Sequence, residues 1–380
     1  MSDWKKVRLG NYIHEYSERN KDDADIPVYS VTNSNGFCTE YFSKEVASKD
    51  KTTYKIVRKG YFAYNPSRIN VGSVDWLRNE DAVIVSPLYN VFYVDDSIDQ
   101  QYLYYYLKSP VGSYYISELA SGSVRDNLKL SILSEFRIPL PDIKTQKEIV
   151  ATLDSIVHMI SVCNAILKKI DLLVKSRFIE LFGDPVSNPH KWDKIPLGEL
   201  AEIKIGPFGT LLHKEDYIQN AHALVNPSHI IDGKIAIDMK LTVSDDKYNE
   251  LSAYHLNIDD VVMGRRGEMG RCAVVSKSGL FCGTGSMIIR SNGRLKADYI
   301  QKIISFPSFK KTIEDMAVGQ TMPNLNVPIV SNFMIICPPI EVQEQYYAFV
   351  EQTDKSKLAV KQVLEKAETL KKALMQEYFG

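Results

Sequence analysis

The feature that most constrains the fold of this 380-residue sequence is an internal repeat. Residues 122–146 read GSVRDNLKLSILSEFRIPLPDIKTQ, and residues 319–343 read GQTMPNLNVPIVSNFMIICPPIEVQ. The offset of 197 residues holds without a gap from Tyr102 against Tyr299 to Gly183 against Gly380. A repeat of this length predicts two copies of one structural unit.

Each copy opens in the same way and then diverges. The segment from Trp4 to Gly10 matches the segment from Trp192 to Gly198 at an offset of 188 residues, so the second copy is about nine residues longer in its middle. Both middles are rich in β-branched and aromatic residues interrupted by turn residues, as in residues 61–66, 81–87 and 260–264. This composition predicts mixed, strand-rich globular blocks.

Each copy closes with a long predicted helix. In the first copy, apolar residues alternate in steps of four and three, which indicates the seam of a coiled coil. The seam consists of Ile149, Leu153, Ile156, Ile160, Cys163, Leu167, Ile170 and Val174. In the second copy the matching positions are Tyr346, Val350, Val360, Leu364, Ala367 and Leu374, interrupted by Thr353, Lys357 and Lys371. Pro141 and the Pro338-Pro339 pair prevent the helices from beginning earlier.

These elements predict an α+β protein with two repeated mixed α/β domains. A helix of about 37 residues is about 55 Å long, and its seam is covered if the second helix runs back along the first. We therefore expect two long antiparallel coiled-coil helices and a dumbbell with an approximate two-fold axis. The expected boundaries are 1–145 for the first domain, 146–183 for its helix, 184–342 for the second domain with a linker at 184–191, and 343–380 for the second helix.

Composition limits the classes of protein to which the chain can belong. The formal net charge is −1, so nucleic-acid binding has to come from local patches. The five cysteines form no CxxC pair, which favours reduced thiols. We expect no signal peptide and no segment with the roughly 18 apolar residues of a membrane helix. The predicted location is the cytoplasm.

A catalytic reading finds little support in the motifs. Residues 65–67, 86–89 and 337–340 each resemble part of the Asn/Asp-Pro-Pro-aromatic loop of adenine methyltransferases, but none has all four positions. The glycine-rich residues 264–270 follow a predicted strand without opening an apolar helical stripe, so they lack the context of a dinucleotide or methyl-donor loop. We therefore predict no catalytic residue, no metal site and no cofactor.

Local basic stretches support DNA binding better. Residues 261–297 contain seven basic residues and one acid, and a second basic stretch is interleaved with Tyr and Asn near residues 51–70. Arg and Asn can read base edges, and Lys can bind phosphate. The alternative for each single residue is a solvated surface or, for the tyrosines, a core position. The candidate DNA-binding residues are Lys51, Lys55, Tyr64, Asn65, Arg68, Asn70, Phe208, Arg265, Arg266 and Arg271.

The ordered motifs, taken together, resemble the DNA-specificity subunit of type I restriction-modification systems over the whole chain. They are the two Trp…Leu-Gly openings, residues 206–209 (GPFG) followed by 214–217 (KEDY), residues 64–66 (YNP), residues 319–325 (GQTMPNL), and helices ending in 181–183 (LFG) and 378–380 (YFG). The first block lacks the GPFG string, which fits two different recognition sequences.

This resemblance implies partners and a division of labour. Two target-recognition domains would each read one half of a bipartite site in double-stranded DNA. The helices would set the spacing and dock two modification (methyltransferase) subunits, with ATP-driven restriction subunits for cleavage and no membrane. Helix-pair contacts are expected at Ile149, Leu153, Ile156, Ile160, Leu167, Ile170, Val174, Val350, Val360, Leu364 and Leu374. The alternatives are a decoy that occupies modification subunits without useful DNA binding and a self-sufficient methyltransferase.

Overall fold

The computed structural model describes residues 4–39, 50–120, 127–208, 211–317 and 324–380. Contacts divide the chain into two compact units. Unit 1 contains residues 1–167 and 358–380, and unit 2 contains residues 168–357. Each unit therefore holds one sequence copy's globular block together with parts of both long helices. The sequence-based boundaries instead treated each helix as a separate segment.

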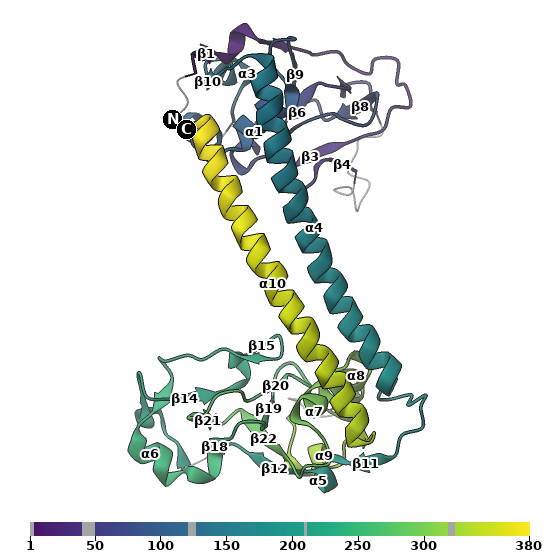
Figure 1. The fold of residues 1–380 in the computed structure, drawn as a ribbon, viewed down its shortest axis with the longest axis vertical. Helices are drawn as coiled ribbons and strands as arrows, with labels where there is room; N and C mark the ends of the chain where they lie inside the picture. The colour runs from purple at the N-terminus through teal and green to yellow at the C-terminus, as the bar shows by residue number, and fades with distance from the viewer. Residues whose placement is uncertain (1–3, 40–49, 121–126, 209–210, 318–323) are drawn as a thin grey trace. The chain divides into compact units, whose positions relative to one another are not determined.

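Unit 1 is built around an antiparallel sheet with the strand order β2-β9-β6-β7 (Figure 1). Smaller pairs, β3-β4, β5-β8 and β1-β10, surround it. The strands are β1 Lys6–Arg8, β2 Ile13–Glu15, β3 Ser30–Thr32, β4 Gly36–Cys38, β5 Lys55–Arg58, β6 Phe62–Tyr64, β7 Val74–Trp76, β8 Ala82–Val85, β9 Asn90–Val94 and β10 Arg137–Pro139. The helices of the block are α1 Gln100–Lys108, α2 Pro110–Ala120 and α3 Leu130–Leu133.

Unit 2 contains an antiparallel sheet with the order β12-β22-β19-β20, and a second sheet with the order β13-β17-β14-β21-β18. The strands are β11 Lys194–Pro196, β12 Ala201–Ile205, β13 Tyr217–Ile218, β14 His222–Val225, β15 Ile230–Ile231, β16 Lys234–Ile235, β17 Thr242–Val243, β18 His255–Leu256, β19 Val261–Gly264, β20 Cys272–Val274, β21 Leu280–Cys282, β22 Ser286–Ser291 and β23 Met334–Ile336. The helices of the block are α5 Leu197–Leu200, α6 Asp245–Glu250, α7 Ala297–Ile304, α8 Pro307–Ala317 and α9 Val327–Ser331.

The two central sheets show that the repeat is structural. Strands β2, β9, β6 and β7 of unit 1 correspond to β12, β22, β19 and β20 of unit 2, and both sheets have the same order of neighbours. The opening of each copy pairs with the strand before its long helix, as β1 with β10 and β11 with β23. Four of the five strands of the second sheet of unit 2 (β13, β14, β17 and β18) lie between β12 and β19 in sequence, in the diverged middle of the copy, and the fifth, β21, lies between β20 and β22. The predicted α+β class with two repeated mixed domains is confirmed.

A buried glutamine joins each block to the beginning of its long helix. The Gln146 side chain accepts a hydrogen bond from the Asp99 N–H and donates to the carbonyls of Ser97 and Pro141. Gln343 makes the same bonds in unit 2, with Lys296 N–H and the carbonyls of Arg294 and Pro338. Both glutamines are fully buried, so these bonds satisfy polar groups that water cannot reach.

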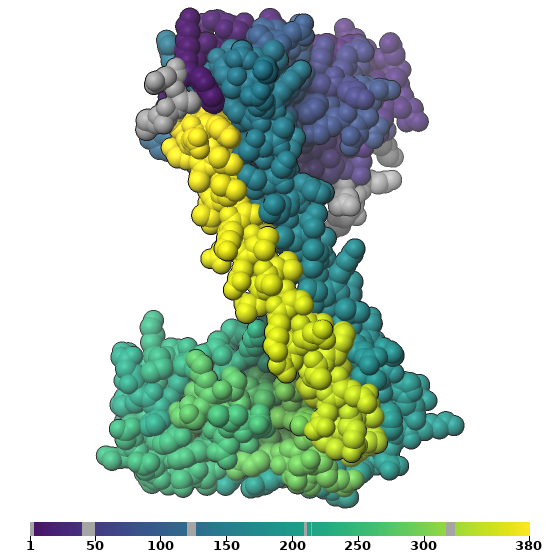
Figure 2. Space-filling view, in the orientation of Figure 1, coloured from purple at the N-terminus to yellow at the C-terminus, as the bar shows by residue number. Residues whose placement is uncertain are grey.

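The long helices are α4 Ile143–Phe182 and α10 Ile340–Phe379. They run antiparallel within each unit: in unit 2 the Lys357 amine of α10 pairs with Asp171 of α4, and Phe182 at the end of α4 contacts Tyr346 near the start of α10. In unit 1, Met375 and Phe379 of α10 share a core with Leu153 near the start of α4. Figure 2 shows the last part of α10 lying along the first part of α4.

The burial pattern of α4 follows the predicted seam. Every seam position from Ile149 to Val174 is buried or half-buried, and most intervening residues are exposed. In α10 the interrupting residues Thr353, Lys357 and Lys371 also fall on the buried or half-buried stripe. The sequence pattern therefore predicted the buried face of α4, while α10 has polar groups in the same face.

One composition-based expectation was wrong. Helix α4 has the length and the apolar composition that a membrane-spanning helix needs, although only 22% of its apolar stretch is buried. The helix is this apolar because it carries apolar residues outside the seam as well as within it, such as Leu172 (63% exposed) and Leu173 (52% exposed). The helix therefore carries a second set of apolar residues that the described chain leaves uncovered.

Candidate DNA interface

Two loops meet where strand β6 of the central sheet of unit 1 ends and strand β9 begins. We call this end of the strands, with its loops, the edge of unit 1. In β9 and β6, Asn90 lies opposite Tyr64, so the turn that enters β9 and the loop that leaves β6 are neighbours. The loop after β6 also binds a distant segment, because Leu128 N–H donates to the Pro66 carbonyl. Leu128 follows residues 121–126, which include most of the repeated GSVRDNL motif and lie outside the described part of the chain.

Some of the candidate DNA-binding residues of unit 1 lie at this edge, and one lies in the adjacent core. Asn65 is half-buried and its side-chain oxygen accepts from Ser67 N–H, while Arg68 and Asn70 are exposed on the same loop. Tyr64 is fully buried, and its hydroxyl donates to the Leu128 carbonyl at 3.0 Å. Tyr64 is thus a core residue, in agreement with the alternative considered for the tyrosines, and burial raises the pKa of its hydroxyl.

The two lysine candidates lie before and at the start of β5. Lys51 is half-buried. The Lys55 ammonium donates to the Tyr89 carbonyl at 2.7 Å, which places it beside the turn that enters β9. Burial lowers the pKa of Lys55. Lys55 therefore supports this edge through a hydrogen bond and brings positive charge to it.

Unit 2 presents the equivalent edge. Gly264 at the end of β19 lies opposite Ser286 at the start of β22, and Gly206 N–H donates to the Ser286 carbonyl. A Cβ at Gly206 would lie 2.1 Å from the Gly283 carbonyl oxygen, so no larger residue fits there without movement. The Gly-Pro-Phe-Gly string of residues 206–209 thus begins where two loops meet, and its Gly209 lies outside the described residues.

The unit 2 candidates differ in how firmly they are held. Phe208 is 64% exposed and Arg266 is exposed. Arg265 is half-buried: its guanidinium donates to the Leu325 carbonyl at 3.0 Å, and Leu325 N–H donates back to the Arg265 carbonyl. Burial lowers the pKa of Arg265. The hydrogen bond from Leu325 N–H to Arg265 corresponds to the one from Leu128 N–H to Pro66 in unit 1. Arg265 therefore holds Leu325, which comes after residues 319–323, and those residues lie outside the described part of the chain.

Several charges of the basic stretch are paired. Lys310 donates one hydrogen bond to Glu268 and Arg271 donates two, and these contacts lower the pKa of Glu268 to about 2. Arg290 forms two hydrogen bonds with the buried carboxylate of Asp260. The charge count over residues 261–297 therefore overstated the free positive charge, because Asp260 and other partners lie outside that stretch.

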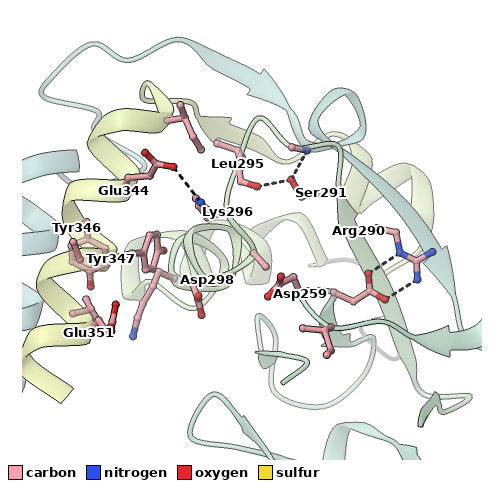
Figure 3. Close-up of a pocket in the computed structure, with 18 of the residues that line it drawn as sticks. Asp259, Arg290, Ser291, Leu295, Lys296, Asp298, Glu344, Tyr346, Tyr347 and Glu351 are labelled. Carbon is pink, nitrogen blue, oxygen red and sulfur yellow. Dashed lines mark hydrogen bonds and ion pairs between the residues drawn. The ribbon is translucent and has the colours of Figure 1, made fainter. Parts of the chain in front are cut away.

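A polar cavity of about 980 Å³ lies elsewhere in unit 2, between α10, the start of α7 and the loops before β19 and after β22. Figure 3 shows Glu344, Tyr347 and Glu351 of α10 on one side. Glu344 pairs with Lys296 at 3.5 Å, which ties the helix to the block. Among the described residues no three His, Cys, Asp or Glu side chains form a possible metal site. Of the charged side chains in the cavity, Lys296 and Glu344 connect the block to α10, and Arg290 pairs with Asp260 within the block.

The family model for the type I restriction modification DNA specificity domain matches residues 1–172 and 189–369, which is both copies. The chain belongs to this family. Proteins of the family carry DNA specificity, so this specificity protein is a recognition component of a restriction-modification system and not a catalytic one. The resemblance stated from the sequence motifs is confirmed.

Curated relatives of this specificity protein come from Methanocaldococcus jannaschii. The type I restriction enzyme MjaIX specificity subunit is 25% identical over 275 residues, which cover 67% of this chain and 62% of that protein. The chain thus matches less than two thirds of that relative's length. The MjaVIII specificity subunit is 21% identical over 98% of this chain and 91% of its own.

Two solved structures share the fold. One, described as the structural basis of complex assembly and conformational transition of the type I R-M system, has a TM-score of 0.60 and 17% identity over 99% of this chain and 97% of its own. The S subunit of a type I system from M. genitalium has a TM-score of 0.58 and 17% identity over 100% of this chain and 96% of its own. These likenesses concern the fold of the specificity protein.

Sequence reasoning missed the two residues that join block and helix. Gln146 and Gln343 occupy matching positions in the repeat, so their recurrence was visible, but nothing in the residue pattern indicated that their partners are backbone groups. It also missed Leu88, a 77% exposed residue in the turn that enters β9. Leu88 had been considered only as part of an incomplete methyltransferase-like loop.

Proposed function

We propose that this specificity protein reads a bipartite DNA site, with one half read by each unit. The observation that carries the proposal is the shared sheet order of the two units combined with different side chains on the equivalent edge. Unit 1 offers Asn65, Arg68 and Asn70 there, whereas unit 2 offers Phe208 and Arg266. One scaffold with two sets of side chains suits two different half-sites.

The chemistry of the two edges fits DNA. Arg and Asn are the side chains that bond guanine and adenine edges with two hydrogen bonds, and basic groups such as Lys55 bind phosphate. The chain has a net charge of −1, so attraction to DNA must come from such local groups. We expect binding that weakens as salt concentration rises.

The helices supply the proposed docking surface. Outside the buried seam, α4 exposes Met159, Val162 and Ile166 in unit 1 and Leu172, Leu173 and Ile179 in unit 2. Exposed apolar side chains in such numbers favour a protein partner. We propose that two modification subunits bind the helices, that the helix pair sets the spacing of the half-sites, and that ATP-driven restriction subunits join for cleavage. DNA inside the cell is the substrate of such a complex, so we propose a cytoplasmic location.

The direct test is DNA binding by the protein together with its modification subunit. We expect a salt-dependent, sequence-selective shift that Arg266→Ala weakens by about 1 to 3 kcal/mol if the lost contact is to a base. Lys144→Ala, an exposed lysine in the first turn of α4, is the control and should leave the affinity unchanged. A complex that holds the modification subunit but shows no selective shift would identify a decoy. Methyl transfer by the isolated protein would identify a self-sufficient methyltransferase.

A further inference from the structure

The side chain of Leu88 is the most exposed large hydrophobic group in the described part of the chain, at 77%. One exposed leucine on a surface is ordinary, since folded proteins expose much apolar area. Leu88 is different in its position, because it lies in the turn that enters β9 on the edge of unit 1 described above. Val71, on the loop between β6 and β7 at the same edge, is 57% exposed.

The turn that carries Leu88 is well held. Tyr89 N–H donates to the Ser86 carbonyl at 3.0 Å, which closes a four-residue turn with Pro87 and Leu88 at its centre. Proline at the second position of such a turn restricts its backbone. The Tyr89 ring is 8% exposed, and its hydroxyl accepts from Val31 N–H at 3.4 Å. Leu88 is therefore exposed on an ordered support.

Polar and charged groups lie near the turn that carries Leu88. The Lys55 ammonium binds the Tyr89 carbonyl at 2.7 Å, one residue from Leu88. Asn65 follows Tyr64, which lies opposite Asn90. An exposed apolar side chain on a turn whose neighbouring carbonyl also holds a cation suits the major-groove edge of a thymine, where a methyl group lies beside a hydrogen-bond acceptor.

We propose that Leu88 is a specificity-determining residue of unit 1, and that it contacts the 5-methyl group of a thymine in the half-site that this unit reads. The inference rests on the proposed function, because it requires that unit 1 bind DNA. Contact would remove both the methyl group and the leucine side chain from water. Burying one methyl-sized group favours binding by about fourfold.

Unit 2 shows that such a side chain is not required by the fold. Its equivalent turn, between β21 and β22, contains Gly283 and Gly285. A Cβ at Gly283 would lie 2.0 Å from the Asn226 side-chain oxygen, so this turn is filled by its own surroundings. Among the described residues of the unit 2 edge, Phe208 is an exposed apolar group, and it lies on the loop after β12 instead. The apolar contact would thus fall at a different position in each half-site.

The test replaces single thymines by uracil, which keeps the base pair and removes only the methyl group. The two half-sites are first read from the methylated bases in a host that carries the protein and its modification subunit. Duplexes with one uracil at each thymine position in turn are then titrated with the complex. For the natural protein, we expect uracil at one thymine position of one half-site to weaken binding about fourfold. For Leu88→Ala, uracil at that position should bind as well as thymine does.

Two comparisons make the result specific. Leu119→Ala, an exposed leucine of α2 in the same unit, should retain the full uracil effect. Uracil in the other half-site should affect both proteins equally. Because Leu88 is exposed, its variant should unfold at the same temperature as the natural protein, and this is measured alongside.

The proposal is overturned if Leu88→Ala binds the natural site as tightly as the unchanged protein. It is also overturned if the variant weakens binding equally on thymine and uracil duplexes, which would indicate packing against sugar or a base face. The proposal is likewise overturned if the half-site that unit 1 reads contains no thymine. These outcomes leave sequence-selective binding intact, whereas failure of the proposed function removes selective binding by the unchanged protein as well.

Discussion

The two units share the groups that hold the strand before each long helix and differ in the loops at the proposed DNA edge. Tyr102 donates its hydroxyl hydrogen to the Pro139 carbonyl at 2.8 Å, and Tyr299 does the same to Ile336 at 3.1 Å. At the edge, by contrast, unit 1 places an exposed leucine in the turn where unit 2 has glycines. The chain thus repeats its supports and varies its contact residues, as expected if two related modules read different sequences.

The ends of the long helices give the sharpest comparison. Phe182 at the end of α4 contacts Tyr299 and Tyr346 in unit 2, and Phe379 at the end of α10 contacts Tyr102 and Tyr106 in unit 1. Both rings are almost fully buried. We expect Phe182→Ala and Phe379→Ala each to lower the free energy of unfolding by about 3 to 5 kcal/mol, the cost of removing a buried ring.

Hydrogen exchange can locate this effect. Phe182→Ala should speed amide exchange in unit 2 and Phe379→Ala in unit 1. Ile179→Ala (44% exposed) and Leu370→Ala (50% exposed) are the matched controls on α4 and α10 and should change little. A large effect at Phe182 with almost none at Phe379 would mean that the last turn of α10 frays and that the two ends are not equivalent.

The buried glutamines are expected to have a smaller effect. Gln343→Ala leaves the Lys296 N–H and two carbonyls without their partner, which should cost about 1 to 3 kcal/mol. Gln146→Ala should cost a similar amount because its bonds are the same. Denaturant unfolding measures both, with the exposed Gln345→Ala as the control. Unequal costs would show that the two block-to-helix junctions are not equivalent.

The smallest effect concerns a charge cluster that unit 2 has in the loop between β19 and β20. The pKa of Glu268 is lowered from its ordinary value of 4.5 to about 2, so its ion pairs stabilise the fold above about pH 4.5 and lose that contribution as the pH falls through 2. The side chain is 51% exposed, which limits the expected loss for Glu268→Gln to less than about 1 kcal/mol at neutral pH.

Unfolding curves at several pH values check this sign. The difference between Glu268→Gln and the unchanged protein should shrink below about pH 4.5 and vanish near pH 2. Glu314→Gln, an exposed residue of α8, serves as the control. A difference that stays constant down to pH 2 would mean that the ion pairs are not the source of the stabilisation.

The long-range periodic features of the fold could be predicted from the sequence. The repeat and the heptad spacing are both visible in the order and spacing of residues, so the two copies and the buried stripe of α4 were predicted without knowledge of any tertiary contact. The pairing of the strands was harder to predict, because pairs such as β14 with β21 join segments more than fifty residues apart. The sequence of a short strand does not indicate with which other strand it pairs. The second sheet of unit 2 was therefore absent from the prediction.

The candidate site was predicted only in part, for a related reason. Counting charges along the chain cannot find partners that folding brings in from elsewhere, as Asp260 is brought to Arg290 and Leu325 to Arg265. Tyr64 was a plausible surface residue by composition, but its place in a central strand buries it. Exposed loops between those strands, with Arg68, Asn70 and Arg266, remain the proposed contacts.

The central claim is that each unit reads its own half of the DNA site. The structure suggests a clean exchange of residues 192–342 for the corresponding block of another family member, since the retained Gln343 binds only backbone groups of that block. The measurement is sequencing of methylated bases in hosts that carry the natural or the exchanged protein with its modification subunit. We predict that one half-site changes while the other half stays as it was. A change in both halves, or in neither, would contradict independent reading by the two units.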